Sequence, residues 1–211
     1  MTNRVMAADG RAIGTRAQAT RRRLMDATAR LLGELGVLEL RVVDITRAIG
    51  TSPATFYQYF PDVDAAILAL ALEATEDERP LVNFLQPEWS SQEGLDQARM
   101  FVDAYIDYWN SHQAVLRIRN LKAEEGDPSF RAARSEANLL VIEAMQTMLR
   151  SSIKAGRLPK ALDPFTAAAA MVAMIERILP FQPEMARRGA DRQAVRESLS
   201  ILLYRGLTGY Q

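Results

Sequence analysis

The stretch Thr51-Ser-Pro-Ala-Thr-Phe-Tyr-Gln-Tyr-Phe60 predicts a turn followed by a short helix of about two turns. Gly50 ends the preceding apolar pattern and suits the left-handed position just past a helix end. Ser52 offers a hydroxyl as N-cap, and Pro53 fits the first helical position, where its missing N–H costs nothing. Pro61 then stops the helix.

This short helix has two different faces. Phe56 and Phe60 are four residues apart, so they share one face that can be buried. Ala54 and Gln58, also four apart, point the opposite way. A short helix that carries a small residue and an amide on its outer face has the length of a recognition helix, which enters the major groove of DNA.

Working outward, the N-terminal part of the chain predicts three further helices. They run over about 20–35, 43–49 and 62–79, the last with Asp62 as N-cap. In the second, Val42, Ile45, Ala48 and Ile49 are expected on one buried face. We expect 20–64 to form a helix-turn-helix domain and 62–79 to connect it to the rest.

Charge is unevenly distributed, although the whole chain is neutral. Residues 1–60 hold nine arginines and five acids, a net charge of +4, and 61–211 carry the compensating −4. We expect 1–19 to form a flexible basic arm that tracks phosphates or enters the minor groove; for 1–15 a solvated tail is the alternative. The arginines at 21–23, beside a helix start at Thr20, are expected near DNA phosphates.

Composition argues against most enzyme classes. The chain has one histidine and no cysteine, which excludes a Cys–His pair and a multi-histidine metal site within one chain. His112 is expected in a structural role where two helices meet. No glycine-rich phosphate loop is present, and no run of 18 apolar residues or signal peptide occurs. We therefore expect a cytoplasmic protein without catalytic residues, metal, cofactor or membrane contact.

The run from Ile45 to Phe60 resembles the helix-turn-helix signature of the tetracycline-repressor-like (TetR) family. The resemblance implies a dimeric, ligand-responsive DNA-binding regulator with a divergent helical C-terminal domain. One segment departs from the family pattern, because Pro61-Asp-Val-Asp64 stands where the family often has a cation that touches phosphate. The positions that match the signature are Ile45, Gly50, Ser52, Thr55, Tyr57 and Phe60.

Position in the motif suggests a role for each candidate. Pro53, Ala54 and Gln58 should face base edges, where glutamine pairs with adenine and small apolar groups touch the thymine methyl. Hydroxyls of Thr55, Tyr57 and Tyr59 should reach phosphate, although packing against a neighbouring helix is an alternative for both tyrosines. Thr46 and Arg47 either touch the DNA backbone or are solvated. The DNA-binding candidates are Arg21, Arg22, Arg23, Arg41, Ser52, Pro53, Ala54, Thr55, Tyr57, Gln58 and Tyr59.

Residues 80–211 are expected to form the ligand-binding and dimerisation domain. A connecting loop over 80–93 precedes five helical segments, which makes an all-α fold of about nine helices; these segments are 95–110, 112–122, 128–155, 164–179 and 191–208. An aromatic, methionine-rich body predicts a pocket, and a packed core is the alternative. The pocket candidates, placed by the family resemblance, are Phe101, Tyr105, Trp109, Met145, Met148, Met171, Met174 and Glu176.

Small residues suggest how two copies associate. The run Ala167–Ala170 lets helices approach closely, and with the last helix it suits a two-fold four-helix interface, as the resemblance implies. Packing within one chain is the alternative. The expected function is a homodimeric regulator, most often a repressor, released from a palindromic DNA operator by a small lipophilic effector. The alternative is a helical carrier or enzyme with a vestigial DNA-binding head.

Overall fold

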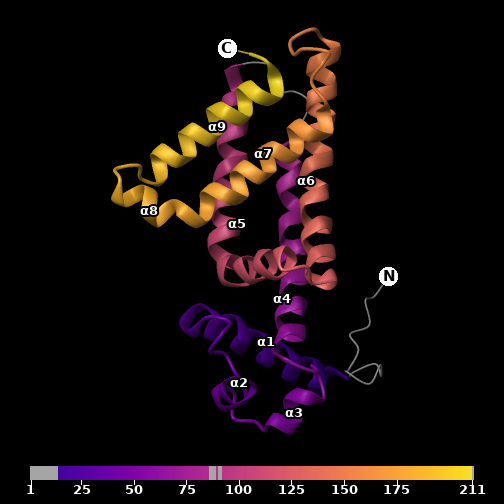
Figure 1. Cartoon of the computed structure of the whole chain (residues 1–211), viewed down its shortest axis with the longest axis vertical. Helices are drawn as coiled ribbons and strands as arrows, with labels where there is room; N and C mark the ends of the chain where they lie inside the picture. The colour runs from indigo at the N-terminus through magenta and orange to yellow at the C-terminus, as the bar shows by residue number, and fades with distance from the viewer. Residues whose placement is uncertain (1–13, 86–88, 90–91, 211) are drawn as a thin grey trace. The chain divides into compact units, whose positions relative to one another are not determined.

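A computed structural model describes residues 14–85, 89 and 92–210, and over these residues every regular element is helical, as predicted (Figure 1). The elements in chain order are α1 (Thr15–Leu35), α2 (Val42–Ala48), α3 (Pro53–Tyr57), α4 (Val63–Glu78), η1 (Arg79–Phe84), α5 (Gln92–Glu124), α6 (Pro128–Lys154), α7 (Pro164–Ile178), η2 (Leu179–Phe181), α8 (Gln182–Arg187) and α9 (Arg192–Thr208).

Contacts divide the chain into two compact units. The first, called the head below, comprises residues up to Ala74 together with Ala114–Arg134. The second, called the body, comprises Thr75–Gln113 and Ser135–Gln211. The α5 helix thus contributes residues to both units, which the expected division at residue 80 did not anticipate.

The head is built on one apolar cluster. Leu24 of α1, Ile45 of α2 and Phe56 of α3 are fully buried in it. Phe130 from the start of α6 belongs to the same cluster, so the head's core is not confined to its first four helices. Burial of this apolar surface stabilises the packing of α1, α2 and α3 against one another.

The first helix begins five residues earlier than predicted, at Thr15 rather than Thr20. The amide of Gln18 donates to the carbonyl of Gly14 at 2.9 Å, and the Thr20 hydroxyl donates to the carbonyl of Arg16 at 3.2 Å. Residues 15–19 are therefore helix rather than arm, which their alanine content permits. The rest of the expected arm, 1–13, lies outside the described residues.

A predicted break near residue 111 is wrong, because α5 is a single helix of 33 residues. Asn110 and Ser111 are weak helix formers and suggested a junction. In the structure the Ser111 hydroxyl donates to the carbonyl of Asp107 at 2.8 Å, a bond within the helix. His112 consequently lies inside α5 rather than at a junction between two successive helices, and its imidazole faces Asp77 of α4 at 3.4 Å.

The sequence also missed the short helices η1, η2 and α8. Within the expected 80–93 loop, residues 80–84 belong to η1, whereas 86–88 and 90–91 lie outside the described residues. The segment expected as one helix over 164–179 is followed by Pro180 and Pro183, which occupy the second positions of η2 and α8, where a backbone N–H has no intrahelical partner.

One segment of the described chain, Pro164–Arg187, has the length and apolar composition of a membrane-spanning helix, with a mean hydropathy of 1.3. It is not one continuous α-helix, since η2 separates α7 from α8. The apolar helix proper is α7, with 15 residues, and spanning a bilayer takes about 20. Only 22% of the apolar window is buried, which leaves α7 with surface for a partner helix.

Candidate nucleic-acid interface and ligand-binding body

The turn before α3 has the geometry that its residues predict. Gly50 has φ 68°, the left-handed conformation that favours glycine. The Ser52 hydroxyl accepts a hydrogen bond from the amide of Thr55 at 3.2 Å, and Pro53 follows at the first helical position. At five residues α3 is shorter than the two turns expected, but its start is capped as predicted.

The two faces of α3 are also as predicted. Phe56 is fully buried and Phe60, just beyond the helix, is 3% exposed, with their ring centroids 5.6 Å apart. Pro53, Ala54 and Gln58 are exposed, as is the capping residue Ser52. The side chains expected to read base edges therefore reach solvent from a backbone that two buried rings hold in place.

The hydroxyl-bearing candidates in and just after α3 differ in how exposed they are. Tyr57 is 52% exposed, which leaves its hydroxyl open to a phosphate. Tyr59 is half-buried and packs against the head's apolar cluster, the alternative that the sequence left open. Thr55 is also half-buried, and its hydroxyl lies 3.1 Å from that of Ser52.

The three arginines at positions 21–23 of α1 all have partners within the head. Arg22 lies 2.7 Å from Asp26 and 2.6 Å from Glu73, and its hydrogen bond to Asp26 is the main cause of its raised pKa. Arg21 lies over the Phe60 ring, and burial lowers its pKa. Arg23 donates to the carbonyl of Ile49 at 2.7 Å. The expected phosphate contacts of these three therefore compete with internal ones.

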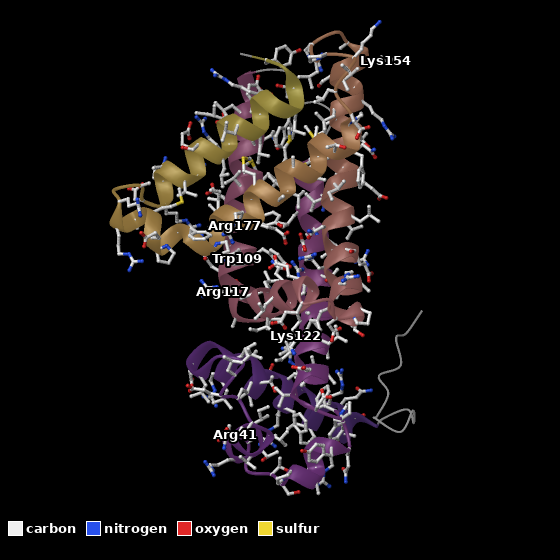
Figure 2. All side chains as sticks on the ribbon, viewed as in Figure 1. Arg41, Trp109, Arg117, Lys122, Lys154 and Arg177 are labelled. Carbon is white, nitrogen blue, oxygen red and sulfur yellow. The ribbon has the colours of Figure 1, made fainter. Side chains whose placement is uncertain are left out.

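The α2 helix presents one candidate and corrects two expectations. Arg41 is exposed at its N-cap, where its amide donates to Asp44 at 3.3 Å; Figure 2 shows it at the edge of the head. Thr46 is buried, and its hydroxyl donates to the carbonyl of Val42 at 3.0 Å, so it fits neither of the two expected roles, backbone contact or solvation. Ala48, expected inside, is exposed. Arg47 is 81% exposed.

The two acids at the start of α4 have structural partners. Asp62 caps the helix by accepting from the amide of Ala65 at 2.7 Å, as predicted. Asp64 lies 2.6 Å from Lys122, which comes from the end of α5 and is labelled in Figure 2. This pair joins positions 58 residues apart, so nothing local in the sequence signalled it. Both carboxylates are thus engaged inside the head.

The body contains the pocket candidates, and its aromatic ones are buried. Phe101 is fully buried, while Tyr105 and Trp109 are each 2% exposed. The methionines divide, with Met145 and Met148 buried but Met171 and Met174 on α7 only half-buried. Burial of these side chains is compatible with both alternatives, a packed core and the wall of a ligand pocket.

Polar groups inside the body were only partly foreseen. Buried Glu78, which the sequence did not single out, accepts hydrogen bonds from the hydroxyls of Tyr108 at 3.2 Å and Tyr105 at 3.4 Å. The half-buried candidate Glu176 accepts from the amide nitrogen of Asn138 at 3.0 Å. The amide oxygen of Asn138 is buried and has no hydrogen-bond partner among the described residues.

A surface hollow of about 570 Å³ lies on a different part of the body, and none of the pocket candidates lines it. Charged and polar residues of α5 and of α9 with its N-cap line it; they are Asp103, Asp191, Arg192, Gln193 and Arg196. Arg196 pairs there with Asp103 at 2.7 Å, and Arg192 with Asp107 at 2.7 Å. Over the described residues, no three histidine or acidic side chains cluster in a way that could hold a metal ion.

Two family models match the chain. Residues 24–70 match the model of bacterial regulatory proteins of the tetR family. Residues 81–211 match the model of the tetracyclin repressor-like C-terminal domain, which is more than half of the chain. A comparison of the sequence with curated proteins gave no match.

Solved structures of bacterial regulators share the fold at low sequence identity. The chain is similar to PfmR from Thermus thermophilus (21% identity, 88% of this chain and 98% of that one, TM-score 0.63). It is also similar to FadR from Bacillus subtilis in complex with stearoyl-CoA (16%, 90% and 99%, TM-score 0.64). A third is a putative transcriptional regulator from Saccharomonospora viridis in complex with choline (19%, 88% and 96%, TM-score 0.70).

Proposed function

The chain belongs to the tetR family of bacterial regulatory proteins, and on that premise we propose that it is a homodimeric transcriptional repressor of the cytoplasm. In this proposal two heads bind a palindromic operator, and a small lipophilic effector bound in the body releases them. The observation that carries the proposal is the short capped helix α3, which exposes Ala54 and Gln58 above buried Phe56 and Phe60.

In this proposal the exposed face of α3 contacts the bases. The Gln58 amide has a donor and an acceptor, which match the N7 acceptor and N6 donor of adenine. Ala54 and Pro53 are small and apolar, which suits contact with a thymine methyl group. The Tyr57 hydroxyl and the Arg41 guanidinium are exposed and would bind phosphate, which sets the register of α3 in the groove.

Effector binding falls to the body. Aromatic rings and methionines offer apolar contact area, and methionine adapts to irregular ligands. Asn138 and Glu176 supply a polar end, because the buried amide oxygen of Asn138 has a free acceptor position for an effector donor. Two related structures hold stearoyl-CoA and choline, respectively, which supports a ligand in this body without identifying it.

Dimerisation through α7 and α9 completes the proposal. Phe165 on α7 is 49% exposed and Leu202 on α9 is 55% exposed, so both helices offer large apolar side chains to a partner. Two heads must meet major grooves about 34 Å apart on one face of the duplex. An effector that favours a different separation of the heads lowers operator affinity by shifting the population of dimers.

Selection of bound sequences from random duplex DNA, followed by affinity measurements over a range of salt concentrations, tests the proposal. We expect a palindromic consensus and a steep fall in affinity with salt, because bound phosphates release counterions. Lipophilic compounds added to the complex should then release the DNA. Absence of salt-sensitive, sequence-selective binding would overturn the proposal in favour of a carrier with a vestigial head.

A further inference from the structure

Arg23 connects the first helix of the head to the turn of the helix-turn-helix motif. Its side chain is exposed on α1, and its Nη2 donates to the carbonyl oxygen of Ile49 at 2.7 Å. Ile49 is the C-cap of α2 and immediately precedes Gly50, where the chain turns toward α3. The contact thus joins two residues 26 positions apart in sequence, and it lies at the turn that orients α3.

The end of α2 explains why this contact matters. The last carbonyls of a helix have no intrahelical partner and need another donor. Here the carbonyl of Thr46 accepts from the amide of Thr51 at 2.9 Å, and that of Arg47 accepts from Gly50 at 3.2 Å. The carbonyl of Ile49 is satisfied by the Arg23 side chain. A cation at this end is also favoured by the helix dipole.

Arg21 supports the other side of the motif from the same helix. Its guanidinium lies 5.0 Å from the ring centroid of Phe60, and its Nη1 donates to the sulfur of Met25 at 3.1 Å. Phe60 follows α3 and is buried with Phe56. Two arginines of α1 therefore contact the chain before and after the exposed reading face.

We propose that Arg23 is a positioning residue for DNA reading rather than a phosphate ligand. By capping α2 it holds the turn from which Ser52, Ala54 and Gln58 are presented to the bases. This inference rests on the proposed DNA-binding function. It replaces the phosphate contact expected for Arg23 from sequence, because the donation from Nη2 to the carbonyl of Ile49 ties the guanidinium to the turn before α3.

Salt dependence separates the two roles. A phosphate contact contributes about 0.9 to the slope of log affinity against log salt, so losing one from each head of a dimer lowers the slope by about 1.8. A positioning residue changes affinity for the operator while leaving the slope unchanged. It also leaves binding to unrelated duplex unchanged, because that binding depends on phosphates rather than on base contacts.

The test uses the full-length protein and the variants Arg23→Ala, Arg23→Lys, Arg22→Ala and Arg41→Ala. For Arg23→Ala we expect operator affinity to fall about tenfold per head, the effect of losing one charged hydrogen bond. Arg23→Lys should recover most of the loss, since an ammonium group also donates. Arg41→Ala is the phosphate reference and should lower the slope. Arg22→Ala is the matched exposed arginine on the same helix.

Hydrogen exchange without DNA supplies a second readout. The amides of residues 49–52, 54 and 55 should exchange faster in Arg23→Ala than in the wild type or in Arg22→Ala. A slope lower by about 1.8 with unchanged exchange would overturn the inference in favour of a phosphate contact, and so would unchanged affinity with unchanged exchange. A wild-type protein that selects no DNA sequence would overturn the proposed function, while exchange would still decide whether Arg23 holds the turn.

Discussion

At the scale of single residues, side-chain exposure decides which of the predicted contacts can form. Gln58 and Tyr57 reach solvent, whereas Thr46 is buried with its hydroxyl bonded to its own helix. Local spacing predicted the faces of α3 correctly, because a turn and two phenylalanines define them. It placed Ala48 on the wrong side of α2, since a helix of seven residues gives the pattern little length.

Replacing Gln58 by alanine should relax sequence preference at one base pair of each half-site. The expected loss of discrimination is about 1–3 kcal/mol, which is the contribution of one bidentate amide–base contact. Competition between operator variants for the wild type and for Gln58→Ala measures it. If the variant discriminates every base pair as the wild type does, Gln58 does not read a base.

The free energy of unfolding should depend on pH through His112. Because His112 is the only histidine of the chain, a single imidazole resonance reports its titration. Burial lowers its pKa, and the carboxylate of Asp77, 3.4 Å away, partly opposes that shift. The folded protein therefore binds fewer protons than the unfolded chain below the ordinary pKa of 6.5. We expect the free energy of unfolding to fall as pH decreases from 6.5 toward the folded pKa.

The imidazole resonance followed by NMR against pH gives the folded pKa directly. Asp77→Asn removes the opposing carboxylate and should lower the pKa of His112 further. His112→Gln should remove this part of the pH dependence of unfolding. A pKa at or above 6.5 in the wild type would contradict the assigned effect of burial.

At the scale of elements, the sequence predicted helix caps better than helix ends within long apolar runs. Ser52, Asp62 and Gly50 act locally, so their roles could be predicted from neighbouring residues alone. α5 continues through Asn110 and Ser111 despite their weak helix propensity, and no local signal predicted the short α8. The pair of Asp64 with Lys122 was unpredictable because 58 residues separate its members.

Two glycines that end helices should differ in how much a methyl group costs. Both have positive φ, 68° at Gly50 and 73° at Gly209. A Cβ added at Gly50 meets nothing within 4 Å, so Gly50→Ala should cost only the backbone strain, about 1–2 kcal/mol. At Gly209 the added atom would lie 2.5 Å from the carbonyl oxygen of Arg157.

We therefore expect Gly209→Ala to lower the urea midpoint of unfolding more than Gly50→Ala does. The Arg157 backbone has little freedom to move away, because its side chain donates to the carbonyl of Thr208 at 2.9 Å. Equal midpoints for the two variants would show that the loop around Arg157 yields to the methyl group.

At the scale of the whole molecule, the proposed mechanism requires two copies. A single head offers one helix of five residues, and a monomer would read only half of a palindromic site. The exposed apolar side chains on α7 and α9 are the surface assigned to the second copy. Sequence reasoning proposed α7 and α9 for dimerisation from Ala167–Ala170 and family resemblance, and that interface stays a prediction. It could not foresee that part of α5 belongs to the head's core.

The variant Leu202→Asp should convert the protein to a monomer, because it places a charge on the proposed α9 interface. Sedimentation equilibrium measures the mass, and operator affinity should fall on the order of a hundredfold or more. Leu139→Asp on α6 is the control, since Leu139 is similarly exposed, at 44% against 55%, but lies outside α7 and α9. A Leu202→Asp protein that remains dimeric would place the interface elsewhere.

Both tryptophans of the chain, Trp89 and Trp109, fall in the body, and each is at most 2% exposed. The head contains none, so tryptophan emission, excited selectively over tyrosine, comes from the body alone. Compounds can therefore be screened by fluorescence in the absence of DNA, and a quench or spectral shift would report occupancy near these indoles. The protein thus carries its own optical probe for the proposed effector.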